Sequence, residues 1–139
     1  MLSINKRNVN IIAYYTSRFL DAETNEDVVE NASYSKLGFQ TRTEFHISIA
    51  NQFGVKQSYV KNMEDSYDSI HGNHRRGWHQ RDLRPAQQQI VDTLSQKDED
   101  ELFVMVKSIM NNNATAALTT LKYKTASDDW GEASDDDIN

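Results

Sequence analysis

Five side chains near the middle of the chain have types that can read base edges or hold phosphates. They are Gln57, Ser58, Tyr59, Lys61 and Asn62, and their spacing predicts that they face outward on one helix. Gln and Asn amides can pair with adenine through two hydrogen bonds, and a Lys can contact a guanine or a phosphate. A Ser near a helix N-terminus can hold a phosphate. Together with the preceding Lys56, the set predicts contact with DNA.

Residues 44–65 should form the helices that position these five side chains. They predict two short helices joined by a tight turn, in which Ala50 lies where the helices pass closely and Gly54 supplies a positive φ. Apolar residues are placed to pack the two helices together: Ile47, Ile49, Phe53, Val55, Val60 and Met63. The pattern favours a helix-turn-helix whose second helix enters the major groove. An ordinary helical hairpin is the structural alternative.

A basic segment follows at residues 71–84. Its four arginines, Arg75, Arg76, Arg81 and Arg84, face one acid and give it a formal charge of +3. The arginines flank Trp78, and His74 and His79 lie among them. The functional interpretation is a positive lobe that grips backbone phosphates beside the second helix, or enters the minor groove. The structural interpretation is a loop anchored by its tryptophan, with solvated arginines, and both can hold together.

The histidines of this segment do not predict a catalytic or metal site. His71, Asn73 and His74 suggest an HNH nuclease, but they crowd one loop and no carboxylate ligand is suitably placed. Zinc binding by His71, His74 and His79 lacks the usual cysteine partners. No nucleophile triad, phosphate-cradling glycine loop or paired carboxylates stand out. We therefore expect no enzyme activity, no metal and no cofactor.

Composition predicts a small helical domain. The chain has 139 residues, one proline, five glycines and no cysteine. This length fits one domain, and the scarcity of turn residues favours an all-α fold. No apolar run is long enough to span a bilayer and no signal peptide is visible, so we expect a cytoplasmic protein without membrane contact. Absence of cysteine fits a reducing compartment.

The charge is distributed unevenly along the chain. There are 15 basic and 21 acidic residues, a net charge of −6, and six of the acids lie in residues 125–139, which hold no Lys or Arg. Residues 1–124 are therefore neutral and form the predicted helical domain, while residues 125–139 form an acidic tail expected to be flexible. A neutral body is weak support for DNA binding. The tail could solubilise the chain, compete with DNA for the basic segment, or mimic DNA toward a partner protein.

Local signals predict where several helices begin and end. Residues 3–20 have apolar side chains at helical spacing, and residues 98–110 form a second such segment with acids at its start. Thr41 and Glu44 have the spacing of a capping box. Pro85 is well placed to begin a helix. The two amphipathic segments could also mediate a homodimer, although core burial explains them equally well.

Four stretches, read in order, resemble a known family. They are residues 10–19 (NIIAYYTSRF), 37–45 (LGFQTRTEF), 49–68 (IANQFGVKQSYVKNMEDSYD) and 75–85 (RRGWHQRDLRP). The chain resembles the helical N-terminal domain of bacterial restriction endonucleases, including HNH-type enzymes. The resemblance implies a DNA-recognition or accessory module without catalysis of its own. It also implies a link to restriction-modification or bacterial defence, in which such a module regulates or inhibits a nuclease.

The sequence thus predicts an all-α domain that binds double-stranded DNA without catalysis. The alternative is a protein-interaction module, such as an inhibitor of a nucleic-acid enzyme related to phage or defence systems, that uses its acidic tail as a DNA mimic.

Overall fold

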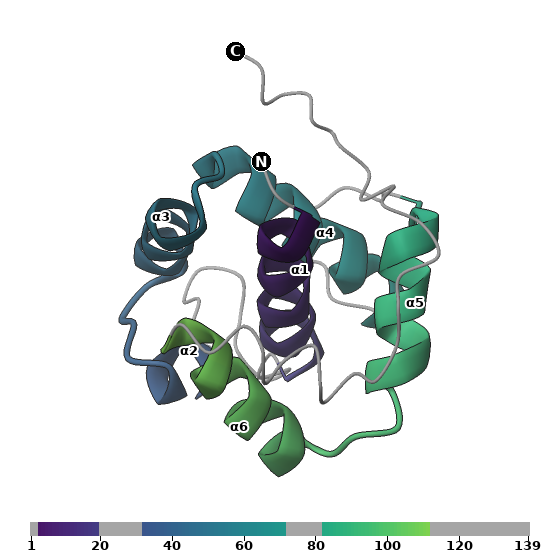
Figure 1. Cartoon of the computed structure of the whole chain (residues 1–139). Helices are drawn as coiled ribbons and strands as arrows, with labels where there is room; N and C mark the ends of the chain where they lie inside the picture. Colours follow the sequence, from purple (N-terminus) through teal and green to yellow (C-terminus); the bar gives the residue numbers. More distant parts are fainter. Residues whose placement is uncertain (1–2, 20–31, 72–81, 112–139) are drawn as a thin grey trace.

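The described part of the chain is helical. The computed structural model describes residues 3–19, 32–71 and 82–111, and these contain six helices and no strand (Figure 1). The helices are α1 (Ser3–Arg18), α2 (Ala32–Lys36), α3 (Arg42–Phe53), α4 (Gln57–His71), α5 (Pro85–Leu94) and α6 (Glu99–Met110). The predicted all-α class is confirmed for these residues. The predicted acidic tail and its boundary with the helical domain lie outside them.

Helix α1 runs through the middle of the molecule, with the other helices around it (Figure 1). Its most extensive contact is with α4, and it also touches α2, α3, α5 and α6. Every side chain from Arg7 to Ser17 is buried, so α1 lies within the core, where the sequence alone suggested one apolar stripe. A helix buried on all sides must satisfy its polar side chains internally. Asn10 and Thr16 of α1 do this through hydrogen bonds to α4.

The ends of the helices follow the predicted capping signals. The Thr41 hydroxyl accepts a hydrogen bond from the Glu44 N–H at 3.0 Å, while the Glu44 carboxylate reaches the N–H of Gln40 rather than that of Thr41. Asp98 and Glu101 form a reciprocal capping box at the start of α6. Pro85 is the first residue of α5. These local contacts fix the start of three helices.

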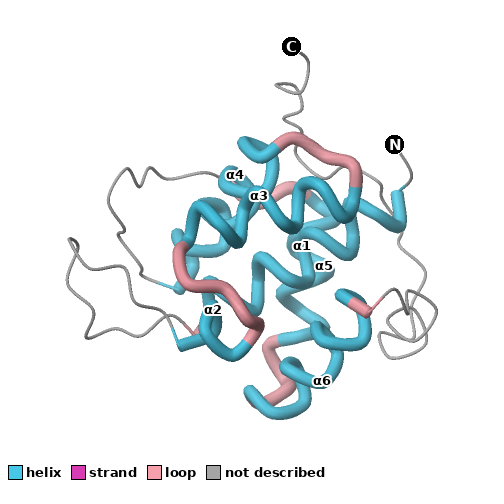
Figure 2. The backbone as a smooth tube through the Cα atoms, turned by 90° about the vertical axis from the view of Figure 1, so that its left-hand side faces the viewer, coloured by secondary structure: helices cyan, strands magenta, loops and turns pink. Residues whose placement is uncertain are grey.

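Helix α6 begins at the end of the molecule opposite the connection between α3 and α4 (Figures 1 and 2) and ends beside α3, where the Met110 carbonyl accepts a hydrogen bond from Gln52 at 2.7 Å. Its first turn carries Glu99, Asp100 and Glu101. These three acids therefore lie away from the polar N-terminal part of α4. Among the described residues, no helix is both long and apolar enough to cross a membrane.

Candidate nucleic-acid interface

Helices α3 and α4 are joined by a tight connection formed by Gly54, Val55 and Lys56. Gly54 has φ 70° and ψ 35°, the left-handed conformation predicted from the sequence, and the N–H groups of Gly54 and Val55 both point to the carbonyl of Ala50. A Cβ at Gly54 would meet nothing within 4 Å. Backbone conformation, and not lack of space, therefore requires glycine here.

The apolar residues of the α3–α4 pair are buried as predicted, with one exception. Ile49, Ala50, Phe53, Val60 and Met63 are buried, and Val55 packs partly against the same core. Ile47 is 43% exposed, so its predicted place between the two helices is wrong. Ile47 comes directly after the buried His46 and lies on the side of α3 that faces away from the core.

The predicted reading residues of α4 divide into two groups. Gln57 and Ser58 are exposed, and Lys61 and Asn62 are half-buried at the surface, as is the preceding Lys56. Tyr59 is only 3% exposed, so its prediction as an outward-facing residue is wrong. A tyrosine stabilises the fold most when its ring is buried and its hydroxyl is hydrogen-bonded. Helix α1 supplies both the packing surface and the hydrogen bond.

Tyr59 is held against α1 by a buried amide. Asn10 donates from Nδ2 to the Tyr59 hydroxyl at 3.2 Å and to the carbonyl of Lys6 at 2.9 Å. The Oδ1 of Asn10 accepts from the Tyr67 hydroxyl at 2.8 Å and from the Gln87 amide at 3.4 Å. Asn10 is fully buried, and it uses both of its donor hydrogens and both acceptor positions. It therefore fixes the N-terminal half of α4 against α1.

Lys61 forms an ion pair on the surface of its own helix. Its Nζ lies 2.9 Å from Oδ2 of Asp65, one turn further along α4. The Oδ1 of Asp65 accepts from the Arg42 guanidinium in α3 at 3.3 Å. Lys61 thus lies on the α3 side of α4, and binding of a phosphate there would compete with Asp65.

A buried carboxylate joins α1, α2, α3 and α4 behind this surface. Oε2 of Glu64 accepts hydrogen bonds from Thr16 at 2.6 Å and from Tyr34 at 2.7 Å. Oε1 lies 3.0 Å from Nε of Arg42 and 2.7 Å from Nε2 of His46. A buried charge is tolerated only when it is paired and hydrogen-bonded, and four donors meet that need. Glu64 therefore fixes how α3 crosses α4.

Two tyrosines of α1 have perturbed pKa values, away from this surface. Burial raises the pKa of Tyr15 to about 12, and the nearby Glu99 and Asp100 add to the effect. Burial also raises the pKa of Tyr14, although Arg18 opposes the shift. Both hydroxyls remain protonated at neutral pH, so neither adds charge to the candidate interface.

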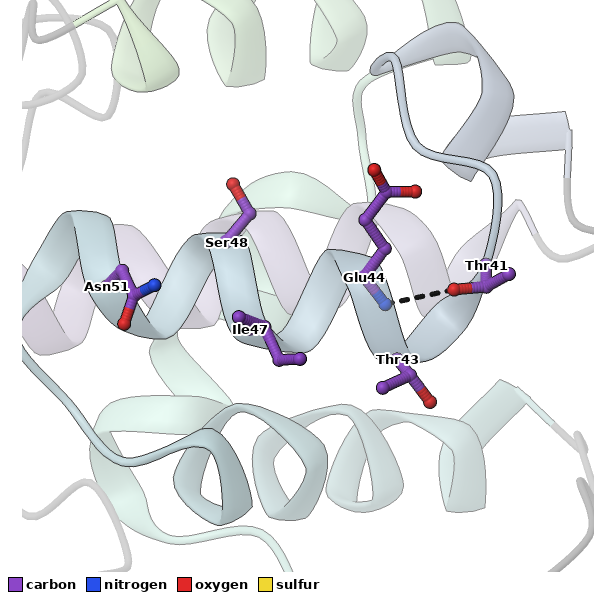
Figure 3. A pocket seen from close by; sticks show the side chains of 6 residues that line it. All are labelled: Thr41, Thr43, Glu44, Ile47, Ser48 and Asn51. Atoms are coloured by element: carbon purple, nitrogen blue, oxygen red, sulfur yellow. Dashed lines mark hydrogen bonds between the residues drawn. The ribbon is translucent and has the colours of Figure 1, made fainter.

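The outer side of α3 carries a shallow depression. Figure 3 shows its lining residues along the exposed side of the helix, with Glu44 and Ser48 on one side and Thr43 on the other. The lining is completed by Thr41, Ile47 and Asn51. One apolar side chain among small polar ones does not define a ligand, and no convergent set of charged groups surrounds it.

Most of the predicted basic segment lies outside the described residues, which resume at residue 82. This applies to His74, Arg75, Arg76, His79 and Arg81. Arg84 is exposed at the start of α5, where its N–H donates to the Gln87 side chain. His71, at the end of α4, lies with Nδ1 2.8 Å from the Ser17 hydroxyl. In the ranges that the structure describes, no three His, Asp or Glu side chains are placed to bind a metal ion.

The sequence alone does not reveal the residues that position α4: Asn10, Arg42 and Glu64. Their contacts join segments between 18 and 77 residues apart, so no local pattern could reveal them. The one available signal was the polar content of α1, because an Asn and a Thr in a buried helix require partners. Comparisons with protein-family models, with curated proteins and with solved structures found no match to this chain.

Proposed function

We propose that the α3–α4 pair is a helix-turn-helix that binds double-stranded DNA and catalyses no reaction. In this proposal the N-terminal half of α4 enters the major groove. The amides of Gln57 and Asn62 read base edges, with adenine as the preferred base. Ser58, Lys56 and Lys61 hold phosphates or guanine. Tyr59 is not one of the reading residues in this proposal, because its side chain is buried against α1.

One observation carries the proposal. The left-handed turn at Gly54 aims α4 so that Val60 and Met63 are buried while Gln57 and Ser58, in the first turn, remain exposed. A recognition helix needs this arrangement, since its first turns must present polar side chains beyond the body of the domain. An ordinary hairpin needs only the buried residues.

The electrostatics of the first turn of α4 support the same conclusion. This turn has no acidic residue. The N-terminal end of a helix carries a partial positive charge, which attracts phosphate when no carboxylate neutralises it. By contrast, α6 begins with three acids and would repel DNA. Of these two helix starts, only that of α4 suits a polyanion.

The basic segment completes the proposed grip. Arg75, Arg76, His79 and Arg81, with His74 and Arg84 at its edges, would clamp backbone phosphates beside α4, because the segment begins where α4 ends. These contacts carry no sequence information but fix the protein on the duplex. The resemblance to restriction-endonuclease recognition domains favours a regulatory role beside a nuclease, in the cytoplasm.

The uneven charge supports a second candidate function. The whole acid excess lies in residues 125–139, which could mimic DNA toward a nuclease or another nucleic-acid enzyme. In that case the chain is an interaction module or inhibitor. Neutralising the six acids should abolish partner binding under this hypothesis, and should strengthen DNA binding under the first.

A paired substitution tests the first proposal. Gln57→Ala with Ser58→Ala removes two exposed side chains from α4, and Gln88→Ala with Ser95→Ala removes two exposed side chains of the same types from the α5 region. We expect the first pair to weaken duplex binding, and the second to leave it unchanged, in a fluorescence-anisotropy titration. Equal affinities for the two double variants would contradict the assignment of α4.

A further inference from the structure

Lys6 of α1 lies beside the proposed reading surface. Its Nζ is 5.9 Å from the centre of the Tyr59 ring. Lys6 is half-buried, and it forms no ion pair within the described ranges 3–19, 32–71 and 82–111. Lys36 and Lys61, by contrast, are each paired with a carboxylate. Lys6 therefore has a charge that no carboxylate of these ranges neutralises.

The position of Lys6 is fixed by the same amide that buries Tyr59. Asn10 donates one Nδ2 hydrogen to the Lys6 carbonyl and the other to the Tyr59 hydroxyl. The Lys6 backbone and the Tyr59 ring are thus tied to one buried side chain. An ammonium group over a tyrosine ring gains a weak further attraction. These contacts hold Lys6 close to the first turns of α4.

Lys6 and Lys61 lie on opposite sides of the exposed strip of α4, which is formed by Gln57, Ser58 and Asn62. Asn62 follows Tyr59 by three residues, and residues three apart are neighbours on a helix. Lys6 therefore borders the Asn62 side of the strip. Lys61 is only two residues from Tyr59 and faces away from it, toward Asp65 and the guanidinium of Arg42 in α3. One cation thus borders the strip on the α1 side and another on the α3 side.

We infer that α1 is part of the DNA surface and that the Lys6 ammonium binds a backbone phosphate beside the groove occupied by α4. The inference rests on the proposed function. A helix in the major groove is bordered by a sugar–phosphate strand on each side, so cations on both edges of its exposed strip match the shape of the duplex. The Lys6 contact fixes orientation and does not select a sequence.

The dependence of duplex affinity on salt tests this contact. Each phosphate neutralised by a cation contributes about 0.9 to the slope of log K against log salt concentration. We expect Lys6→Gln in the full chain to lower that slope by about 0.9. A fourfold rise in salt should then weaken wild-type binding about 3.5-fold more than K6Q binding. Lys6→Arg keeps the charge and should keep the slope.

Lys97 provides a matched control. It is half-buried, like Lys6, and lies in the connection between α5 and α6. Lys97→Gln removes the same charge and should leave the slope unchanged. Slopes are compared at a temperature where thermal unfolding shows every variant to be folded.

Each outcome of this comparison decides the inference. If the wild type binds and K6Q has the wild-type slope, the Lys6 contact is wrong and the proposed function stands. If K97Q lowers the slope as much as K6Q, or if K6R behaves like K6Q, a phosphate contact specific to Lys6 is also wrong. If the wild type does not bind duplex at low salt, the proposed function fails, and the inference with it.

Discussion

The contacts of Glu64 explain how α4 can place a carboxylate in the core. Its side chain is fully buried, and donors from four positions in the chain reach its two oxygens: Thr16, Tyr34, Arg42 and His46. The carboxylate is stable because every acceptor position is used. Removing one donor should therefore be costly, whereas removing an unpaired polar group should not.

Two tyrosine substitutions compare the loss of a hydrogen-bonded hydroxyl with the loss of an unpaired one. Tyr34→Phe removes a donor to Glu64 and should lower the free energy of unfolding by about 1.5–3 kcal/mol. Tyr15→Phe removes a buried hydroxyl that has no partner among the described residues, and should leave stability unchanged or slightly higher at neutral pH. Urea denaturation measures both. A larger loss for Y15F than for Y34F would contradict the assigned contacts.

The raised pKa of Tyr15 also predicts that the stability of the fold depends on pH. Its pKa is raised to about 12 in the folded chain, above the value near 10 of an unfolded tyrosine. The folded state therefore holds this proton more tightly. The resulting stability is fully present below about pH 10 and is lost as the pH rises through 12. We expect the wild type to lose ~2–3 kcal/mol relative to Y15F across that interval.

Asp65 should restrain the phosphate-binding ability of Lys61. Asp65→Asn removes the negative charge that holds the Lys61 ammonium at 2.9 Å. We expect a steeper salt dependence of duplex binding, by up to about 0.9 in slope, because Lys61 can then neutralise a phosphate. Adding Lys61→Gln to D65N should cancel the gain. A D65N slope equal to that of the wild type would show that Asp65 does not restrain Lys61.

At the scale of elements, the sequence predicted helix ends better than helix faces. Thr41, Gly54, Pro85 and Asp98 mark ends because a cap or turn involves only residues within a few positions. The burial of Tyr59 could not be predicted in this way. It depends on Asn10, 49 residues earlier, and on α1 being buried on all sides. Tertiary contacts of this kind leave no local pattern.

The connection between α3 and α4 yields a prediction at the same scale. Gly54→Ala places a Cβ on a left-handed residue and should cost about 1–2 kcal/mol of stability. It should also weaken duplex binding, because relief of the strain reorients α4.

Gly38→Ala is the matched control. Gly38 has φ 96°, no atom within 4 Å of a Cβ, and a place before α3 rather than between α3 and α4. It should lower stability in urea denaturation without changing the duplex affinity of the folded protein. Equal losses of affinity in the two variants would contradict a specific role for the α3–α4 turn.

At the scale of the whole molecule, one cluster of acids lies apart from the lysines around the α3–α4 connection. The acids at the start of α6 lie at the end opposite the α3–α4 connection, while Lys6, Lys56 and Lys61 lie near that connection. The sequence showed the neutral body and the acidic tail, but not this separation, because it depends on how the helices pack around α1. Under the proposed function, we therefore expect the first turns of α4 to attract DNA more than the net charge of −6 suggests.

The acidic segment should weaken DNA binding by competition. Replacing its six acids by the corresponding amides keeps the chain length and removes six negative charges: Asp128, Asp129, Glu132, Asp135, Asp136 and Asp137. We expect this variant to bind duplex more tightly than the wild type at low salt, since a tethered polyanion no longer competes for the cationic residues. Unchanged affinity would exclude such competition.

The most direct test of the central claim is a duplex titration of this amide-substituted full-length chain over a range of salt concentrations. We expect binding at low salt that weakens steadily as salt rises, and a loss of affinity when Gln57 and Ser58 are both replaced by alanine. Absence of binding at the lowest salt, or binding unaffected by that double substitution, would contradict the claim that α4 contacts DNA.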